Sequence, residues 1–349
     1  MKTTGKSIVS EFSVEIGDRN ITQDLMPLLV NLRVQISSAA HLDEAEIRFS
    51  DEKGAVLPKI GAYSLRIGFR GEDEKASSLL FVGAIDGVRS ECNRSGGRHL
   101  TISAKSGDLF GRLKERQERH WDETTISEAF AAAAQSVGLT AHVDPELGQL
   151  RRGWLAMEGE SFLAFGQRLA SEIGGTFRVS GGHAVLLARS GGRTASGREL
   201  STIAAVYGEN LISWDIAPVA ARPRYSQVVV PSYDARAGAS SAETLDIPSG
   251  GASAKLISGR PAGDPEEARQ RAHALLVETA RHSGGGEILI AGNQKALPEA
   301  LCKLSGARTG IDGSYRILAV EHTLARNEGF LTRLQLGEPA DGAGSSHRD

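Results

Sequence analysis

The sequence predicts a β-rich α+β protein, in which strand-rich segments at both ends flank a smaller α/β segment. Glycine makes up 41 of the 349 residues, against roughly 7% in ordinary chains, and aromatic residues make up only 5%, so turns and bulges should be plentiful. Apolar and polar residues alternate with period two near both ends, whereas the middle contains helical stripes. The hydrophobic fraction of 40% suffices for two or three cored units.

The first domain is expected to span residues 1–112 and to be an antiparallel barrel or sandwich of six or seven strands. Its apolar and polar residues alternate as they do in strands with one buried face. A charged segment at 70–75 and a glycine-containing one at 94–97 are the expected turns. Strands are predicted at 13–16, 32–36, 46–49, 63–69, 80–85 and 100–104.

A small α/β insertion is expected at 113–200, where the apolar period changes from that of a strand to that of a helix. Thr125 and Glu128 form a capping box before an apolar stripe, which predicts the start of a first helix. Gly174 and Gly175 end the apolar side of a second one. Two helices and a hairpin are therefore predicted, at 126–138, 161–173 and 176–187.

The last domain is expected to span 201–340, followed by a flexible tail at 341–349. From 234 to 263 the composition turns to Ala, Ser, Gly and Pro, which favours an exposed loop. A helix is predicted at 264–282, since Asp264 is a suitable N-cap and is followed by a proline and two acids. Strands are predicted at 211–216, 225–230, 287–291, 302–304, 315–321 and 330–336.

One pattern recurs in the first and last domains, each time on a strand-turn-strand segment whose second strand carries Leu-Thr. The recurring residues are Val88, Arg94 and Gly97, then Val320, Arg326 and Gly329. Two related β units would explain the repeat. Turn chemistry restricts the choice of residues, so two unrelated amphipathic hairpins could also share this pattern.

Composition argues against several classes of protein. The formal net charge is −3, so no global positive field attracts nucleic acid. Basic residues are concentrated at 112–119, but Glu115 and Glu118 interrupt them, which favours a solvated face or a protein contact. The longest apolar run is six residues, 129–134, too short for a signal peptide core or a membrane span. We expect no specific nucleic-acid binding, no membrane span and synthesis in the cytosol.

No group of residues is spaced for metal binding. None of the nine histidines lies three or four residues from another on a helix, as a helical zinc site requires. Residues 120–123 pack possible ligands together, but four adjacent residues converge on one ion only within a tight loop. Cys92 and Cys302 are too few for a disulfide framework, and Cys92 is expected to be a small buried side chain, with the redox state of both left open.

Motifs typical of catalysis or of nucleotide binding are present only in part. Gly5-Lys6-Ser7 resembles the end of a phosphate-binding loop, but a strand follows it instead of a helix. No Gly-x-Gly-x-x-Gly stands between a strand and a helix. Residues 159–163 lack the closing glycine of a nucleophile elbow and better suit a helix start. We therefore predict that the protein is not an enzyme and has no catalytic, cofactor-binding or metal-binding residues.

Residues 116–200 carry a more specific pattern. It runs RQERHWDETTI at 116–126, EGESFL at 158–163, RLA at 168–170, GG at 174–175 and TASG at 194–197. Together, these motifs resemble the late control gene D protein family, the tail hub proteins of contractile-tailed phages. Order and spacing agree over about 85 residues, although Phe165 and Gly166 widen the gap after Leu163 and Gln167 precedes Arg168.

The resemblance implies a structural role. Relatives in that family include the hub half of type VI secretion VgrG proteins and the baseplate hub of T-even phages. It implies two related antiparallel β-barrel hub domains with the α/β insertion between them. It further implies a homotrimer whose six barrels match a sixfold tail tube to a threefold spike. The expected partners are the tail tube, the tail spike, the tape measure and other baseplate proteins.

An alternative hypothesis comes from another functional class. A hub could also bind or hydrolyse peptidoglycan through the 113–200 insertion, whose mix of strands and helices suits a small carbohydrate-binding module. No catalytic pair favours hydrolysis, and the 43 acidic residues are too many for their number to be informative. The expected location is the tail baseplate of a virion, after synthesis in the bacterial host cytoplasm.

Overall fold

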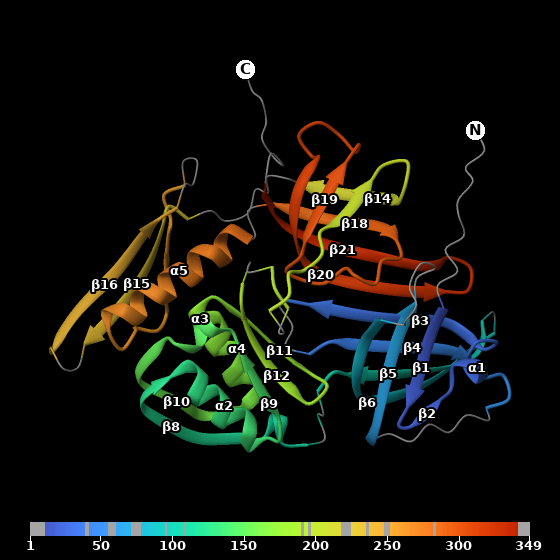
Figure 1. Ribbon diagram of the computed structural model, residues 1–349, viewed down its shortest axis with the longest axis horizontal. Helices are drawn as coiled ribbons and strands as arrows, with labels where there is room; N and C mark the ends of the chain where they lie inside the picture. Colours follow the sequence, from blue (N-terminus) through green and yellow to red (C-terminus); the bar gives the residue numbers. More distant parts are fainter. Residues whose placement is uncertain are drawn as a thin grey trace.

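The computed structural model describes residues 11–38, 42–54, 61–70, 78–94, 96–107, 109, 111–189, 192–194, 197–217, 225–234, 237–247, 252–281 and 284–340. The predicted flexible tail at 341–349 and the motif at 5–7 lie outside these residues. Figure 1 shows two groups of strands side by side, coloured blue and orange-red, with a green insertion and an orange helix-and-strand layer beside them.

The first unit of the fold contains seven strands in the order β3-β4-β7-β6-β5-β1-β2, all antiparallel. Their bounds are β1 Glu11–Ile16, β2 Arg19–Asn20, β3 Leu29–Ser37, β4 Glu44–Ser50, β5 Gly61–Arg70, β6 Ser78–Asn93 and β7 Gly97–Lys105, with the short helix α1 at Thr22–Leu25. Alternating residues such as Leu32, Val34 and Ile47 are fully buried, which confirms the strands predicted from period-two patterning.

The second unit contains six strands in the order β14-β18-β21-β20-β19-β13. Their bounds are β13 Ile203–Val206, β14 Leu211–Ala217, β18 Gly285–Ala291, β19 Leu301–Ser305, β20 Gly313–Ala325 and β21 Gly329–Ala340. A separate apolar core fills this unit, with Ile288, Tyr315 and Leu334 fully buried. The two units pair through β3 and β20, so all their strands belong to one 13-stranded sheet.

The two units repeat one topology. Strands β1, β3, β4, β5, β6 and β7 follow one another in the chain and in the sheet as β13, β14, β18, β19, β20 and β21 do. The repeat differs at one strand, because β1 pairs antiparallel with β5 whereas β13 pairs parallel with β19. The recurring sequence pattern therefore lies on equivalent hairpins.

The repeat extends to single residues. In the hairpins, Asn93 pairs with Gly97 and Ala325 with Gly329, and both glycines have φ +75°, a backbone conformation that a glycine tolerates best. The register shift between Ile85 and Gly87 in β6 recurs in β20 between Ile317 and Ala319. The shift between Leu29 and Asn31 in β3 recurs in β14 between Leu211 and Ser213. Such coincidences are typical of two copies of one unit.

The described strands form no closed barrel, so the expected two-barrel architecture is not confirmed. In the second unit the ends of the sheet, β13 and β14, are joined by one isolated bridge, Tyr207 to Leu211, and by no ladder. In the first unit, β2 and β3 end the strand order without pairing to each other. Each unit is thus a curved open sheet in the part of the chain that the structure describes.

The insertion has two sheets around two helices. Strand β8 (Arg116–Thr125) pairs with β10 (Arg151–Ser161), and β9 (Thr140–Val143) joins the hairpin of β11 (Gly175–Ser180) and β12 (His183–Ala188). Helices α2 (Ile126–Ser136) and α4 (Phe162–Ile173) confirm both predicted helices, and the short η1 (Arg112–Lys114) and α3 (Pro145–Gly148) complete the unit. Strands β8, β9 and β10 are features that the sequence did not predict.

The segment from 234 to 263 is not simply a loop, which corrects that expectation. Strand β16 (Ala239–Asp246) pairs with β15 (Gln227–Asp234), and β17 (Lys255–Ile257) pairs with the other side of β15. Helix α5 (Pro265–Arg281) confirms the predicted helix and packs on β15 and on α4. Figure 1 accordingly shows β15 and β16 beside the insertion, with α5 running from them toward the second unit.

Candidate functional site

The pairing of β3 with β20, here called the joint, connects the two units of the fold. Residues 31–37 of β3 pair antiparallel with residues 319–325 of β20. On the polar face of this joint, Arg33 contacts the carboxylate of Glu321 at 2.5 Å. Because backbone hydrogen bonds continue from one unit into the other, the two units are held as one rigid sheet.

Aromatic side chains pack against the apolar face of the joint. Phe69 of the first unit stacks on Phe330 of the second, with ring centroids 4.4 Å apart. His322 lies against Phe330 and is fully buried, and its Nδ1 lies 3.1 Å from Thr332 Oγ1. Burial lowers the pKa of His322 to about 4, although a backbone hydrogen bond to Ala296 opposes that shift. This histidine is therefore neutral and structural at physiological pH.

A second contact ties α5 to both units. Arg281, at the end of α5, donates to Glu299 Oε1 at 2.8 Å and to Ser38 Oγ at 2.9 Å. Ser38 in turn donates to the carbonyl of Leu318 in β20. The Arg281 and Glu299 side chains are 5% and 12% exposed, so water weakens this ion pair little.

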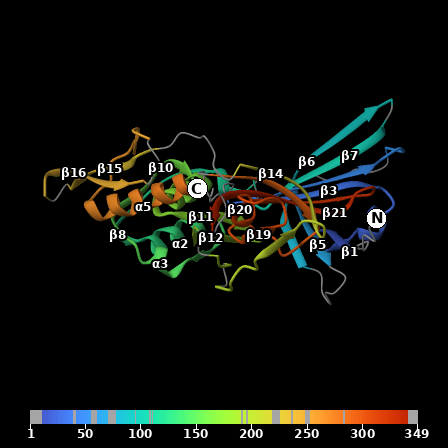
Figure 2. The same ribbon diagram turned by 90° about the horizontal axis from the view of Figure 1, so that it is seen from above.

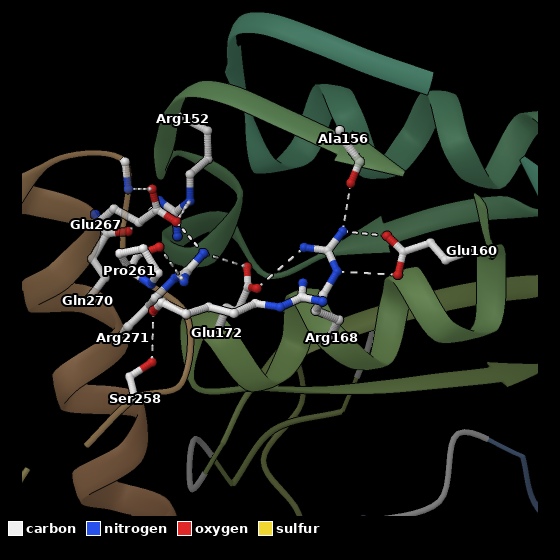
Figure 3. A network of polar contacts seen from close by, with 12 residues as sticks. Arg152, Ala156, Glu160, Arg168, Glu172, Ser258, Pro261, Glu267, Gln270 and Arg271 are labelled. Carbon is white, nitrogen blue, oxygen red and sulfur yellow. Dashed lines mark hydrogen bonds and ion pairs between the residues drawn. The ribbon is translucent and has the colours of Figure 1, made fainter. Parts of the chain in front are cut away.

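A chain of buried ion pairs fixes α5 to the insertion (Figure 3). Arg168 of α4 contacts Glu160 and Glu172, and Glu172 also lies 3.4 Å from Arg271 of α5. Arg271 contacts Glu267, which lies 3.7 Å from Arg152 of β10. Three arginines therefore face three glutamates, so the network is neutral as a whole.

Arg152 is the most buried member of this network. Its side chain is 1% exposed, and it donates to Gln270 Oε1 at 2.6 Å and to the carbonyl of Arg151. Burial lowers the pKa of Arg152, and the nearby Glu267 and Glu172 oppose that shift. The network fixes the positions of α4, α5 and β10 relative to one another.

The insertion is also fixed to the first unit. Arg178 of β11 contacts Asp43 at 2.5 Å, and Leu42 forms a parallel bridge with Val179. Burial raises the pKa of Asp43, although the Arg178 guanidinium acts in the opposite direction. Together, these contacts make the insertion, α5 and both units one connected scaffold.

The sequence motifs weighed as possible sites have structural roles. Residues 120–123 lie in strand β8, and Ser161 caps α4 by accepting from the Ala164 amide. Cys92 is exposed, which corrects the expected burial, whereas Cys302 is buried. Among the described residues, no three His, Cys, Asp or Glu side chains gather as a metal site would require. No described helix has the length and apolar composition to cross a membrane.

Two features were not predicted. His142 and His183 meet at 3.1 Å because β9 pairs parallel with β12, a contact that no sequence spacing indicates. A pocket of about 150 Å³ lies over strands β3, β4, β6 and β7. Its walls carry charges of both signs, from Arg33, Glu44, Glu46, Asp86 and Lys105. It is an open hollow in the polar face of the sheet and holds no set of groups suited to catalysis.

Comparison with known proteins agrees with this structural character. The family model of the phage tail baseplate hub (GPD) matches residues 63–328. The chain belongs to the phage tail baseplate hub family. No curated protein matches the sequence. Membership supports a baseplate hub role, in a family of structural proteins of the phage tail.

Solved structures share the fold over nearly the whole chain. The tail protein from Neisseria meningitidis MC58 is 16% identical, with a TM-score of 0.71, covering 96% of this chain and 98% of its own. The 43 kDa tail protein of prophage MuSo2 from Shewanella oneidensis is 16% identical, with a TM-score of 0.69 and coverages of 95% and 98%. An Escherichia coli component of the type VI secretion system is 12% identical, with a TM-score of 0.52 and coverages of 95% and 77%.

Proposed function

We propose that this baseplate hub protein acts as a homotrimer that adapts a sixfold tail tube to a threefold spike. The repeat of one strand topology within a single rigid chain supports the proposal most directly. Three copies of a chain with two equivalent units supply six similar surfaces in a ring, while the chain as a whole repeats only three times. A ring of this kind closes through heterologous contacts between neighbouring copies.

The structure of the joint suits this role. A symmetry adaptor must hold its two units in a fixed relation, because a change in their angle would open the ring. The β3–β20 ladder, the Phe69–Phe330 stack and the Arg281 side chain, which donates to both Ser38 and Glu299, each resist such a change. The tail tube and the spike are the partners that we propose for the two faces of the ring, within the tail baseplate of a virion.

The decisive experiment measures mass and symmetry together. The purified full chain, alone and with its spike protein, is analysed by native mass spectrometry and by electron microscopy of particles viewed down the ring. A threefold mass with six similar densities around the axis is expected. A stable dimer, or a trimer with only three densities, would contradict the adaptor role.

Binding or hydrolysis of peptidoglycan through the 113–200 insertion stays a hypothesis. Zymography on cell wall tests hydrolysis, and retention on insoluble peptidoglycan tests binding, with a variant lacking the positive charge of Arg116 and Arg119 as the control for nonspecific adsorption. Lysis would indicate an enzyme, and retention without lysis a binding module.

A further inference from the structure

The three-stranded sheet of the insertion carries two histidines on its outer face. Strand β12 pairs antiparallel with β11 and parallel with β9. Its inward residues, Ala184 and Leu186, are fully buried in the core of the insertion. His183 of β12 and His142 of β9 alternate with inward residues and are both exposed. The two imidazoles therefore project from the face turned away from that core.

The parallel register brings these two side chains together. His183 lies opposite Thr140, and His142 lies opposite Val185, so the histidines are diagonal neighbours on one face. His142 Nε2 lies 3.1 Å from His183 Nδ1. The residues are 41 positions apart in the chain, so a search for helical or adjacent histidine spacings does not find them.

The distance between the nitrogens suits two ligands of one metal ion. Imidazole nitrogens bind Zn²⁺ and similar ions at about 2.0–2.1 Å. At that bond length, an angle of about 90° at the metal places the nitrogens about 2.9 Å apart, and a tetrahedral angle places them about 3.4 Å apart. The 3.1 Å between His142 Nε2 and His183 Nδ1 lies between these values.

The relation of the two rings agrees with this. Two imidazoles that point at one ion have ring centroids about 4.5–5.3 Å apart, whereas a straight hydrogen bond of the same N–N length would place them about 5.4 Å apart. The centroids of His142 and His183 are 4.9 Å apart, and the rings are tilted by 52°. The pair thus has the spacing of a chelate without rearrangement of the backbone.

We propose that His142 and His183 bind one divalent transition-metal ion, of the class of Zn²⁺, Ni²⁺ and Cu²⁺, through Nε2 and Nδ1 respectively. Imidazole is a favoured ligand of these ions, whereas Ca²⁺ and Mg²⁺ take oxygen ligands. Each ring stays neutral, with its proton on the nitrogen that does not face the ion. Binding therefore requires a change of tautomer in one ring and no further reactant.

Water completes the coordination of this ion. The sites that hold zinc permanently use three or four protein ligands, and the described residues contain no group of three His, Cys, Asp or Glu side chains. A site with two imidazoles and bound water is open, so its ion exchanges with solution. It also leaves positions that a ligand from outside this chain can occupy.

The charges around the pair permit a cation to bind. Arg178 of β11 is on the same face of the sheet, opposite Val185. Its guanidinium contacts the carboxylate of Asp43 at 2.5 Å, so its positive charge is compensated. The remaining outward residues of β9 and β11 near the pair, Thr140 and Ser180, carry no charge.

A bound ion would tie β9 to β12. Strand β9 has four residues and is the last strand of its sheet, and helix α2 packs on it. A ligand that binds only the folded state stabilises that state. Figure 2 shows α2 and α3 of the insertion in the half of the molecule opposite to the β6–β7 ribbon. Metal binding there does not depend on the proposed trimer.

The test uses the full chain without a histidine tag, after dialysis against a chelator. Isothermal titration with Ni²⁺ should give one saturable site per chain. Electron paramagnetic resonance of the Cu²⁺ form should show two nitrogen ligands. Ni²⁺ should also raise the Tm by a few degrees at concentrations well above the Kd.

Single substitutions assign the ligands. His142→Ala and His183→Ala should each weaken Ni²⁺ binding about 100-fold, because the second nitrogen of a chelate binds at a high effective concentration. Both side chains are exposed, so the metal-free variants should keep the Tm of the wild type. His120→Ala is the matched control, an exposed histidine of β8, and should leave binding unchanged.

A third imidazole tests the register independently. Thr140 lies opposite His183 and two residues before His142 on the same face. Thr140→His should therefore tighten Ni²⁺ binding roughly tenfold or more. This variant gains affinity, so its result cannot be explained by misfolding.

The outcomes decide the proposal. Saturable binding at one ion per chain that either alanine variant removes and Thr140→His strengthens supports it. It is overturned if wild-type protein shows no saturable site, or if binding survives in both His142→Ala and His183→Ala. Neither result bears on the mass and symmetry that test the hub role.

Discussion

Removing the negative charge of Glu267 should destabilise the protein far more than removing that of its neighbour, Glu266. Glu267 is 8% exposed, contacts Arg271 at 2.5 Å and lies 3.7 Å from Arg152. It also accepts from the Gly263 amide at 2.9 Å, at the start of α5. Glu267→Gln keeps the shape of the side chain and leaves one positive charge uncompensated among the buried arginines.

The expected size of the effect follows from that burial. Removing one partner of a buried ion pair costs about 3–5 kcal/mol, because the other charge stays desolvated. The lower end applies here, since Arg271 keeps a contact to Glu172 and Arg152 keeps its hydrogen bond to Gln270. At about 2–4 °C per kcal/mol, a loss of about 3 kcal/mol lowers Tm by about 6–12 °C.

Glu266→Gln provides the matched control on the same helix. Its side chain is 64% exposed and pairs with Arg269 at 2.8 Å, and such surface pairs contribute at most about 1 kcal/mol. Differential scanning calorimetry of the two variants beside the wild type measures the difference. If Glu267→Gln lowered Tm no more than Glu266→Gln did, the network in Figure 3 would not be a stabilising contact between α5 and the insertion.

Three further predictions concern single positions. Gly83→Ala should prevent normal folding or cost several kcal/mol, because a Cβ there would lie 2.2 Å from the Lys105 carbonyl oxygen. Gly153→Ala is the control: the space around Gly153 is open, so this substitution should be neutral or slightly stabilising in urea unfolding. Burial holds the pKa of His322 at about 4, below its unfolded value near 6.5. The stability that the neutral histidine contributes is therefore present above pH 6.5 and is lost as the pH falls toward 4. His322→Gln should flatten the pH dependence of the free energy of unfolding in urea between these two values. Thr125→Ala removes the cap of α2 and should cost about 1 kcal/mol, measured by the same unfolding assay, and an unchanged midpoint would contradict the capping box.

The helices were predictable because their signals are local. The capping box of Thr125 and Glu128 is present as expected, and Gly174 adopts φ +69° at the end of α4. Helix α5 begins at Pro265, as the proline at the first helical position indicated. In each case the residues that stop or start the helix are adjacent to it in the chain, so no long-range contact was needed to interpret them.

Strands β8 and β16 are among those that were missed, and their residues do not alternate in polarity. Strand β8 carries mostly charged or exposed side chains, and β16 consists largely of Ala and Ser with little burial. What makes each a strand is a partner, β10 for the first and β15 for the second. Backbone pairing of this kind leaves no period-two signal when neither face is well buried.

The repeat of the two β units was only partly detected from the sequence: the hairpins were recognised, but the similarity of β3 and β14 was not. The recurring pattern on the two hairpins was detectable at Gly97 and Gly329, because a turn with positive φ nearly always requires glycine. The similarity between Leu29-Val30-Asn31-Leu32 of β3 and Leu211-Ile212-Ser213-Trp214 of β14 was available but carries no turn residue to draw attention to it.

The joint itself could not have been predicted, since Arg33 and Glu321 lie 288 residues apart and nothing local indicates that their strands meet. Pairing of β3 with β20 is decided by which edges remain free after each unit has folded.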